Sequence, residues 1–248
     1  MVRWLVQTLG LFTPLVTVIG LLVGGWWSAS TLILALGIYP ILDLLLGDSS
    51  ITDPLEESKT FDFIVHTHGI LVPVVIATLL YQAYFDYTAF IWLAAVSVGM
   101  SSGASGIITA HELGHRRPRS RSWWLSRLDL MCVLYLHFTV EHNHTHHKHW
   151  AKPRDPTSSP WKRNVYVHFI RTIPLQLMGA YRAKPKDFRY SMLVQLTLLI
   201  TLFIISPVLL GVFLLQAIVA IFLLEFVNYL QPVSYTHLRA HETLRYLV

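Results

Sequence analysis

The sequence contains little charge and almost no cysteine, and each shortage excludes a class of protein. Charged residues make up 13% of the 248 positions and hydrophobic residues 54%. That balance excludes an intrinsically disordered chain and is unusual for a soluble protein. The single cysteine, Cys132, excludes an internal disulfide and any metal site built from four thiolates.

Charge is almost absent from five long apolar blocks. Each of the first four is about the ~20 residues that a helix needs to cross a bilayer, and the fifth is long enough for two helices. Six buried helices of a soluble bundle would need polar outer faces, and these blocks have none. The first block is too long for a signal peptide's apolar core, and no small-residue cleavage site precedes Trp26, so we expect it to be retained. The sequence therefore predicts an all-α integral membrane protein with six transmembrane helices. The blocks are residues 5–27, 29–46, 63–85, 88–110 and 191–230.

The distribution of Lys and Arg predicts the orientation of these helices. Fifteen of the nineteen lie between Arg116 and Arg189, whereas the expected outer turns near Gly24, Asp86 and Pro207 contain none. Because cytoplasmic loops are enriched in Lys and Arg, we expect the N-terminus and the whole 116–189 region to be cytoplasmic. This asymmetry explains the sequence pI of 9.4, so no nucleic-acid partner is expected.

A first histidine group, His111 and His115, stands where the fourth apolar block ends. Residues four apart lie on one face of a helix, so both imidazoles are expected side by side. With Glu112 the pair matches His-Glu-x-x-His, which can hold zinc with the glutamate as general base. The other interpretation is a capping and charge cluster at a helix end.

A second histidine group comprises His142, His146 and His147, within the sequence Glu-His-Asn-His-Thr-His-His-Lys-His. Neutral imidazole binds zinc, copper, nickel or iron, whereas magnesium and calcium prefer oxygen ligands. The other interpretation is a solvated basic loop. Five candidate ligands in the two groups exceed what one tetrahedral zinc uses, which favours a two-metal site. The remaining residues, His144 and His149, are expected to point elsewhere, as surface or supporting residues.

Four motifs resemble those of membrane-bound alkane monooxygenases, within the fatty acid desaturase superfamily. They agree with that family in order and spacing, and the resemblance covers roughly residues 30 to 230. Thr145 departs from the pattern, because the alkane hydroxylases usually have glycine there, and the related xylene-type methyl hydroxylases stay open as an alternative. The motifs are His-Glu-Leu-Gly-His-Arg at 111–116, Glu-His-Asn-x-x-His-His at 141–147, Asp-Pro-Thr-Ser-Ser at 155–159 and Leu-Glu-Phe-Val-Asn-Tyr at 224–229.

The resemblance implies a multi-pass enzyme of the bacterial inner membrane with a cytoplasmic, helical, all-histidine di-iron centre. Electrons would come from NAD(P)H through a reductase and a rubredoxin, and one atom of O₂ would enter a terminal or benzylic C–H bond of an apolar hydrocarbon. Glu112 and Glu141 would orient the ligand rings, and Glu225, an acid within an apolar block, is expected to support the site. No catalytic residue is expected beyond the ligands of the two Fe ions, which are His111, His115, His142, His146 and His147.

The family pattern stops after residue 230. A third histidine box should follow, but residues 234–243 resemble the translation of sequencing-adapter DNA. Pro232 is also expected to interrupt the helix at this point. We therefore expect residues 1–230 to be an incomplete monooxygenase domain, inactive as it stands, and residues 231–248 to be a non-native tail. His237 and His241 imitate a ligand pair, and we do not assign them to the site.

Three other functions compete. A membrane fatty-acid desaturase or hydroxylase also holds two irons with histidine boxes. Its middle box usually has the spacing His-x-x-His-His, which is shorter than the three residues between His142 and His146 here. An intramembrane zinc metalloprotease would use the first histidine group and leave the second unexplained. A metal transporter or sensor would place its ligands within the spans. Only His66 and His68 lie near a span, at its expected cytoplasmic start.

Overall fold

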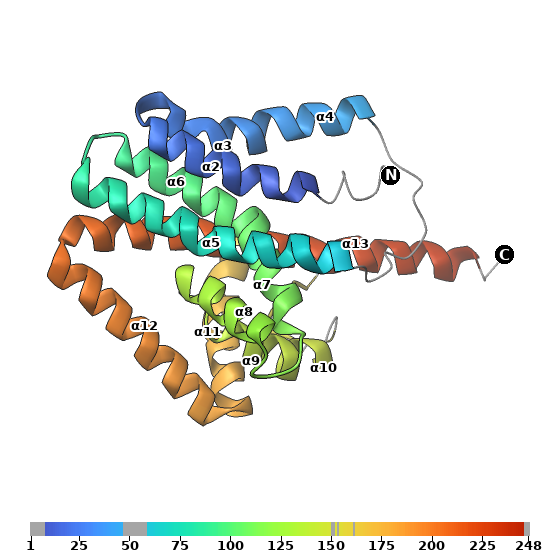
Figure 1. Cartoon of the computed structure of the whole chain (residues 1–248). Coiled ribbons are helices and arrows are strands. Elements are labelled where there is room, and N and C mark those ends of the chain that lie inside the picture. Colours follow the sequence, from blue (N-terminus) through green and yellow to red (C-terminus); the bar gives the residue numbers. More distant parts are fainter. Residues whose placement is uncertain (1–7, 47–58, 150–151, 153, 161, 246–248) are drawn as a thin grey trace. The chain divides into compact units, whose positions relative to one another are not determined.

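The computed structural model describes residues 8–46, 59–149, 152, 154–160 and 162–245, with residues 231–245 as backbone alone. Every regular element in this described part is helical (Figure 1). The α-helices are α2 (Phe12–Val23), α3 (Ser30–Ile33), α4 (Tyr39–Leu46), α5 (Lys59–Phe85), α6 (Ile91–Ser101), α7 (Ile107–Gly114), α8 (Arg121–Cys132), α9 (Phe138–Glu141), α10 (His147–His149), α11 (Val165–Ala183), α12 (Pro185–Ile205) and α13 (Pro207–Arg245).

Five helical stretches are long and apolar enough to cross a membrane. The chain is therefore an all-α, multi-pass membrane protein, as predicted. A sixth apolar helix is shorter, Leu9–Val23, where the sequence predicted a full span over 5–27. It ends early because Gly24 and Gly25 adopt φ values of 75° and 57°, a left-handed conformation that glycine tolerates and that breaks the helix. The long stretches are Gly25–Leu46, Lys59–Phe85, Ile91–Gly114, Pro185–Ile205 and Pro207–Leu230.

The chain forms two compact units, and the first comprises Met1–Leu134 with Leu198–Ala220. Its core is apolar and includes Leu79, Ala95 and Phe213, all almost completely buried. Small residues let its helices approach closely. A Cβ atom on Gly99 would lie 2.6 Å from the carbonyl oxygen of Gln216, so only glycine permits this contact between α6 and α13.

The second unit comprises Tyr135–Thr197 with Ile221–Val248, and it is built around polar groups. Helix α11 shows this most clearly, because the face that it buries carries His168, Thr172 and Gln176. Its opposite face is apolar and exposed. An inside-out pattern of this kind suits a helix whose outer face contacts lipid and whose inner face surrounds a polar site.

Three helices contain a single π-helical turn, in which the backbone hydrogen bonds run from i to i+5. Such turns contain one more residue than an α-helical turn and are often found at functional sites. In this chain one of them contains most of the second histidine group. The turns are Leu34–Ile38, Ser102–Gly106 and His142–His146.

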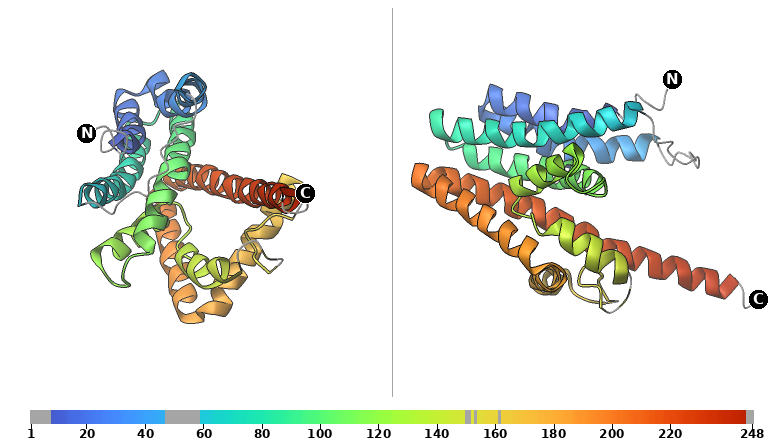
Figure 2. Two further views of the ribbon diagram at one scale, coloured as in Figure 1. Left: turned by 90° about the vertical axis from the view of Figure 1, so that its right-hand side faces the viewer. Right: turned by 60° about the horizontal axis from the view of Figure 1, so that its bottom comes forward.

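Helix α13 continues past the position where the sequence predicted it to stop. It runs from Pro207 to Arg245 and appears as one continuous helix in both views of Figure 2. The prediction that Pro232 interrupts the helix is therefore wrong. A proline removes one backbone hydrogen bond, while the bonds of the neighbouring turns persist and carry the helix onward.

Candidate metal centre

The first histidine group lies at the C-terminal end of α7, where a candidate membrane span ends. His111 occupies the last turn and His115 caps the helix. Their Nε2 atoms are 3.0 Å apart. Two nitrogens that bind one ion at about 2.1 Å each would be separated by about 3.0 to 3.4 Å. The separation fits a shared metal ion and equally a hydrogen bond between the two rings, and the role of the pair as ligands stays a prediction.

Glu112, predicted to orient a ligand ring, contacts a cation, and its predicted role stays a prediction. Its carboxylate lies 3.4 Å from the guanidinium of Arg116, which also donates a hydrogen bond to Asp62 at 2.8 Å. These two ion pairs connect the end of α7 to the first turn of α5. Both are partly exposed, so each contributes little to stability.

The second histidine group is gathered by the π-helical turn His142–His146. Because this turn closes after five residues, side chains four and five positions apart lie close together. The ring centroid of His142 is 5.0 Å from that of His146 and 4.4 Å from that of His147. Nitrogens of His142 and His147 lie within 4.8 Å of one another. An α-helical turn would direct His147 away from His142, and the π turn brings the two rings together.

Asp155 holds the imidazole of His146 in place, a role that the sequence analysis did not assign. Its Oδ2 lies 3.0 Å from His146 Nδ1, and the hydroxyl of Thr157 lies 2.6 Å from the same nitrogen. Asp155 also accepts hydrogen bonds from Ser158 Oγ and from the backbone N–H of Thr157. Burial favours the neutral acid, but these hydrogen bonds and the nearby imidazole outweigh it and lower the pKa of Asp155. An ionised carboxylate on Nδ1 leaves Nε2 of His146 to bind a metal, as carboxylates behind histidine ligands do.

Glu141 is completely buried in α9, beside the second histidine group. Burial, together with the negative charges of Asp155 and Glu225, raises its pKa to about 8. Neither carboxylate oxygen has a hydrogen-bond partner among the described residues. A buried acid without partners needs a compensating group, and a metal ion or its histidine ligands would supply one. Its predicted role in orienting a ligand stays a prediction.

Glu225 is buried within α13 and receives hydrogen bonds from several side chains of the second unit. Tyr135 donates its hydroxyl proton to Oε1 over 2.7 Å, and Gln176 donates its amide to the same oxygen over 2.8 Å. Asn228 donates to Oε2 over 3.3 Å. These donors explain how an acid is kept within an otherwise apolar helix.

Two further buried histidines, His137 and His168, were not singled out from the sequence. Burial lowers the pKa of each to about 4, with the charge of Arg163 contributing at His168. None of their ring nitrogens has a hydrogen-bond partner among the described residues. They stand outside any ligand spacing, so the sequence offered no signal for them. His144 and His149 line a cavity that none of the five predicted ligands lines.

The sequence profile of the fatty acid desaturase family matches residues 87–245, which include both histidine groups. The chain belongs to the fatty acid desaturase family. It is also similar to alkane 1-monooxygenase 1 of Alcanivorax borkumensis, with 31% identity over 192 residues, covering 72% of this chain and 45% of the relative.

Two further relatives have the same kind of name. The alkane 1-monooxygenase of Pseudomonas putida is 30% identical over 191 residues, covering 72% of this chain and 46% of its own length. Alkane 1-monooxygenase 1 of Pseudomonas aeruginosa is 31% identical over 247 residues, covering 89% of this chain and 64% of the relative. The chain thus spans about half the length of the first two relatives. It is an alkane monooxygenase-like member of the desaturase family.

Proposed function

We propose that the chain supplies the membrane-embedded, histidine-rich part of a non-haem di-iron monooxygenase. The enzyme would place one atom of O₂ in a C–H bond of an apolar hydrocarbon and release the other as water. A rubredoxin-type protein and its NAD(P)H reductase would deliver the electrons. The observation that carries the proposal is the 3.0 Å separation of Nε2 atoms in the first histidine group, together with a π turn that gathers the second. The relatives' names supply the reaction.

The donor set suits iron. Five imidazoles with no thiolate are ligands typical of zinc, copper, nickel or iron, and among these iron with open coordination positions activates O₂. When bound, the two ions would supply the redox chemistry of C–H hydroxylation. The chain would hold them through the first and second histidine groups. Asp155 would keep the Nε2 lone pair of His146 directed at the metal through its hydrogen bond to Nδ1.

The apolar helices would deliver the substrate. A hydrocarbon dissolves in the lipid bilayer, so it can reach a site at the end of a span without crossing water. His111 lies in the last turn of the span Ile91–Gly114, at that boundary. We propose that this boundary faces the cytoplasm of the bacterial inner membrane, because soluble electron donors dock there.

Metal analysis of the full chain, expressed in membranes with iron supplied, tests the metal centre. We expect tightly bound iron in the wild type and loss of most of it in the double variant His142→Ala/His147→Ala. His149→Ala, a histidine that lines the separate cavity, is the matched control and should retain the metal. Stoichiometric zinc in place of iron, or equal iron in all three proteins, would contradict the proposal.

Product analysis tests the substrate class, since the family also favours a second candidate. A fatty acid desaturase or hydroxylase acting on an acyl chain is the alternative, and the family match over residues 87–245 favours it. Cells that express the chain with a rubredoxin and its reductase should convert a medium-chain alkane to the 1-alcohol. Desaturated or hydroxylated acyl chains without alcohol would favour the second candidate.

We also propose a boundary at residue 230, with residues 231–248 foreign to the domain. The resemblance of residues 234–243 to translated adapter DNA supports this boundary, whereas the desaturase match extends to residue 245. Sequencing the native gene beyond codon 230 decides between them. We expect different codons followed by a third histidine box, and the same eighteen codons in genomic DNA would overturn the boundary.

A further inference from the structure

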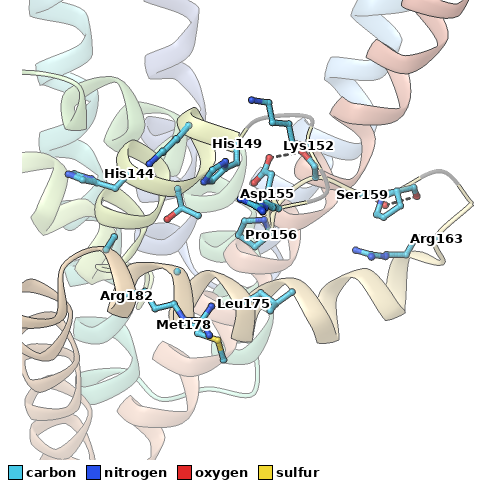
Figure 3. Close-up of a pocket in the computed structure, with 17 residues that line it drawn as sticks. His144, His149, Lys152, Asp155, Pro156, Ser159, Arg163, Leu175, Met178 and Arg182 are labelled. Carbon is cyan, nitrogen blue, oxygen red and sulfur yellow. Dashed lines mark hydrogen bonds between the residues drawn. The ribbon is translucent and has the colours of Figure 1, made fainter.

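The second unit contains a cavity of about 880 Å³ beside the second histidine group, and none of the five predicted ligands lines it. It lies between the loop that follows α10 and the helix α11, with Asp155 and Pro156 on one side and Leu175 and Met178 on the other (Figure 3). All of its lining residues belong to the second unit. The cavity is therefore a property of one compact part of the chain.

The cavity is strongly basic. Among the described residues that line it, the one acid is Asp155, whose side chain is fully buried and bonded to His146, Thr157 and Ser158. The oxygens of that carboxylate thus already accept hydrogen bonds within the protein. Five cations surround the remaining space, so the cavity favours an anion. The cations are Lys148, Lys152, Arg154, Arg163 and Arg182.

One wall of the cavity is apolar and continues onto the exposed face of α11. Leu175 and Met178 line the cavity, yet they are 46% and 45% exposed. The same helix exposes Ile170 by 75% on its outer side, away from its buried polar residues. Basic residues beside an exposed apolar face are typical of a helix that lies in the membrane interface.

The cavity also stands where the chain enters the membrane. Arg182 lines it, and three residues later Pro185 begins the candidate span Pro185–Ile205. A residue this close to the start of a span lies at the level of the lipid headgroups. An anion that carries a long apolar group is therefore the ligand that reaches this position most directly.

We propose that this cavity binds an anionic phospholipid. The phosphate would lie among the cations, with Arg154 and Arg182 as its principal partners, and the acyl chains would follow Leu175 and Met178 along the outer face of α11. A free phosphate would use the cations and leave the apolar wall unused. A soluble acidic protein would have to cover the exposed apolar side chain of Ile170.

Lipid titration into the purified full chain tests this proposal, and it needs no metal. Fluorescent phosphatidylglycerol and phosphatidylcholine with the same acyl chains are titrated into delipidated protein in a neutral detergent. Phosphatidylglycerol should bind more tightly, and salt should reduce the difference. Removing two cations, each contributing on the order of 1 kcal/mol near a lipid surface, should weaken its binding about 30-fold in Arg154→Gln/Arg182→Gln.

The control variant Arg117→Gln/Arg121→Gln removes the same charge at exposed positions outside the cavity and should bind both lipids as the wild type does. Arg154→Lys/Arg182→Lys keeps the charges and should restore most of the preference, which separates charge from a folding defect. Equal binding of the two lipids by the wild type would overturn the proposal.

Two further arms distinguish other ligands. Glycerophosphoglycerol, the headgroup without acyl chains, should compete poorly, and competition as strong as that of the whole lipid would replace the proposal with a free-anion site. A rubredoxin-type protein is titrated into the same variants. If the loss of Arg154 and Arg182 abolishes its binding and leaves the lipid preference intact, the cavity is a protein-docking site and the proposal fails.

Discussion

At the scale of single residues, the ligands and the groups that support them differ in how visible they are in the sequence. The predicted histidine ligands can be recognised from their spacing, because each group lies within one helical segment. Asp155 contacts His146 from nine positions away across a loop, so no helical periodicity connects the two. Glu112 shows the reverse case, because a carboxylate within the motif contacts Arg116. A contact across a loop, such as that between Asp155 and His146, is therefore not visible in the sequence.

Asp155→Asn should weaken iron binding by about 10- to 100-fold, as expected when a carboxylate behind a histidine ligand is lost. The amide cannot hold the Nδ1 proton of His146 with a full negative charge, so the ring becomes a poorer ligand. Competition with a chelator of known affinity measures the change. Asp86→Asn, an exposed acid in a turn, is the control and should leave iron binding unaltered. Equal chelator midpoints in both variants would show that Asp155 does not support the metal.

Asp129 should make the fold less stable as pH rises. It is buried in α8 without a hydrogen-bond partner among the described residues, and burial raises its pKa to about 9. Between its ordinary pKa of 3.8 and that value, the folded chain binds a proton that the unfolded chain releases. The free energy of unfolding therefore falls with rising pH, by at most about 1.4 kcal/mol per pH unit.

The variant Asp129→Asn carries no titrating group at this position. Its melting temperature in detergent, relative to that of the wild type, should rise between pH 5 and pH 8. A difference that is constant across that range would mean that Asp129 is ionised in the folded protein.

At the scale of elements, the π turn explains how three imidazoles of the second histidine group come together although the spacing in the motif is one residue longer than His-x-x-His-His. In an α-helix, His-x-x-His-His places three rings on one face at positions i, i+3 and i+4. This chain has three residues between His142 and His146, and the π turn absorbs the additional one. Both spacings thus present three imidazoles together. The longer spacing, which the sequence analysis used against a desaturase, is a difference in backbone winding and not in the ligand set.

Helix α11 leaves room for that turn at Gly179. A Cβ atom there would lie 3.4 Å from Thr145 Oγ1 and 3.7 Å from Cγ of Glu141, an ordinary contact that alanine satisfies. Gly179→Leu should push the π turn away and reduce iron binding at least about tenfold, with Gly179→Ala close to the wild type. In a double-mutant cycle, Thr145→Gly should recover part of the loss, because the two side chains compete for one space. Additive losses would show that the residues do not interact through this contact.

The sequence predicted much of the architecture because apolar length and histidine spacing are local signals. It predicted the spans that contain α5, α6, α12 and α13, and it placed His111 beside His115 on one helix face. It could not predict the π turns, since these depend on packing around residues of no special type. It also gave no sign that α11 buries polar side chains such as Gln176, because their partners lie on other helices.

At the scale of the whole molecule, both compact units bury polar as well as apolar side chains, and the second unit contains most of the basic residues. The predicted orientation places those basic residues on one side of the membrane. It depends on each apolar helix crossing the bilayer once, and one crossing separates Asp86 from Arg121, namely Ile91–Gly114.

Cysteine labelling tests that crossing, and the chain offers a simple background for it. Cys132 is the one cysteine, and it is buried in α8. Burial and the neighbouring Asp129 also raise the pKa of its thiol, which makes it unreactive, and Cys132→Ser removes it altogether.

Into this background Asp86→Cys and Arg121→Cys are introduced separately, both at exposed positions. An impermeant maleimide should label Asp86→Cys in intact spheroplasts and label Arg121→Cys only after the membrane is permeabilised. Labelling of both in intact cells would mean that Ile91–Gly114 does not cross the bilayer. The reverse pattern would place the histidine groups outside, away from any cytoplasmic electron donor, and would rule out the proposed electron path.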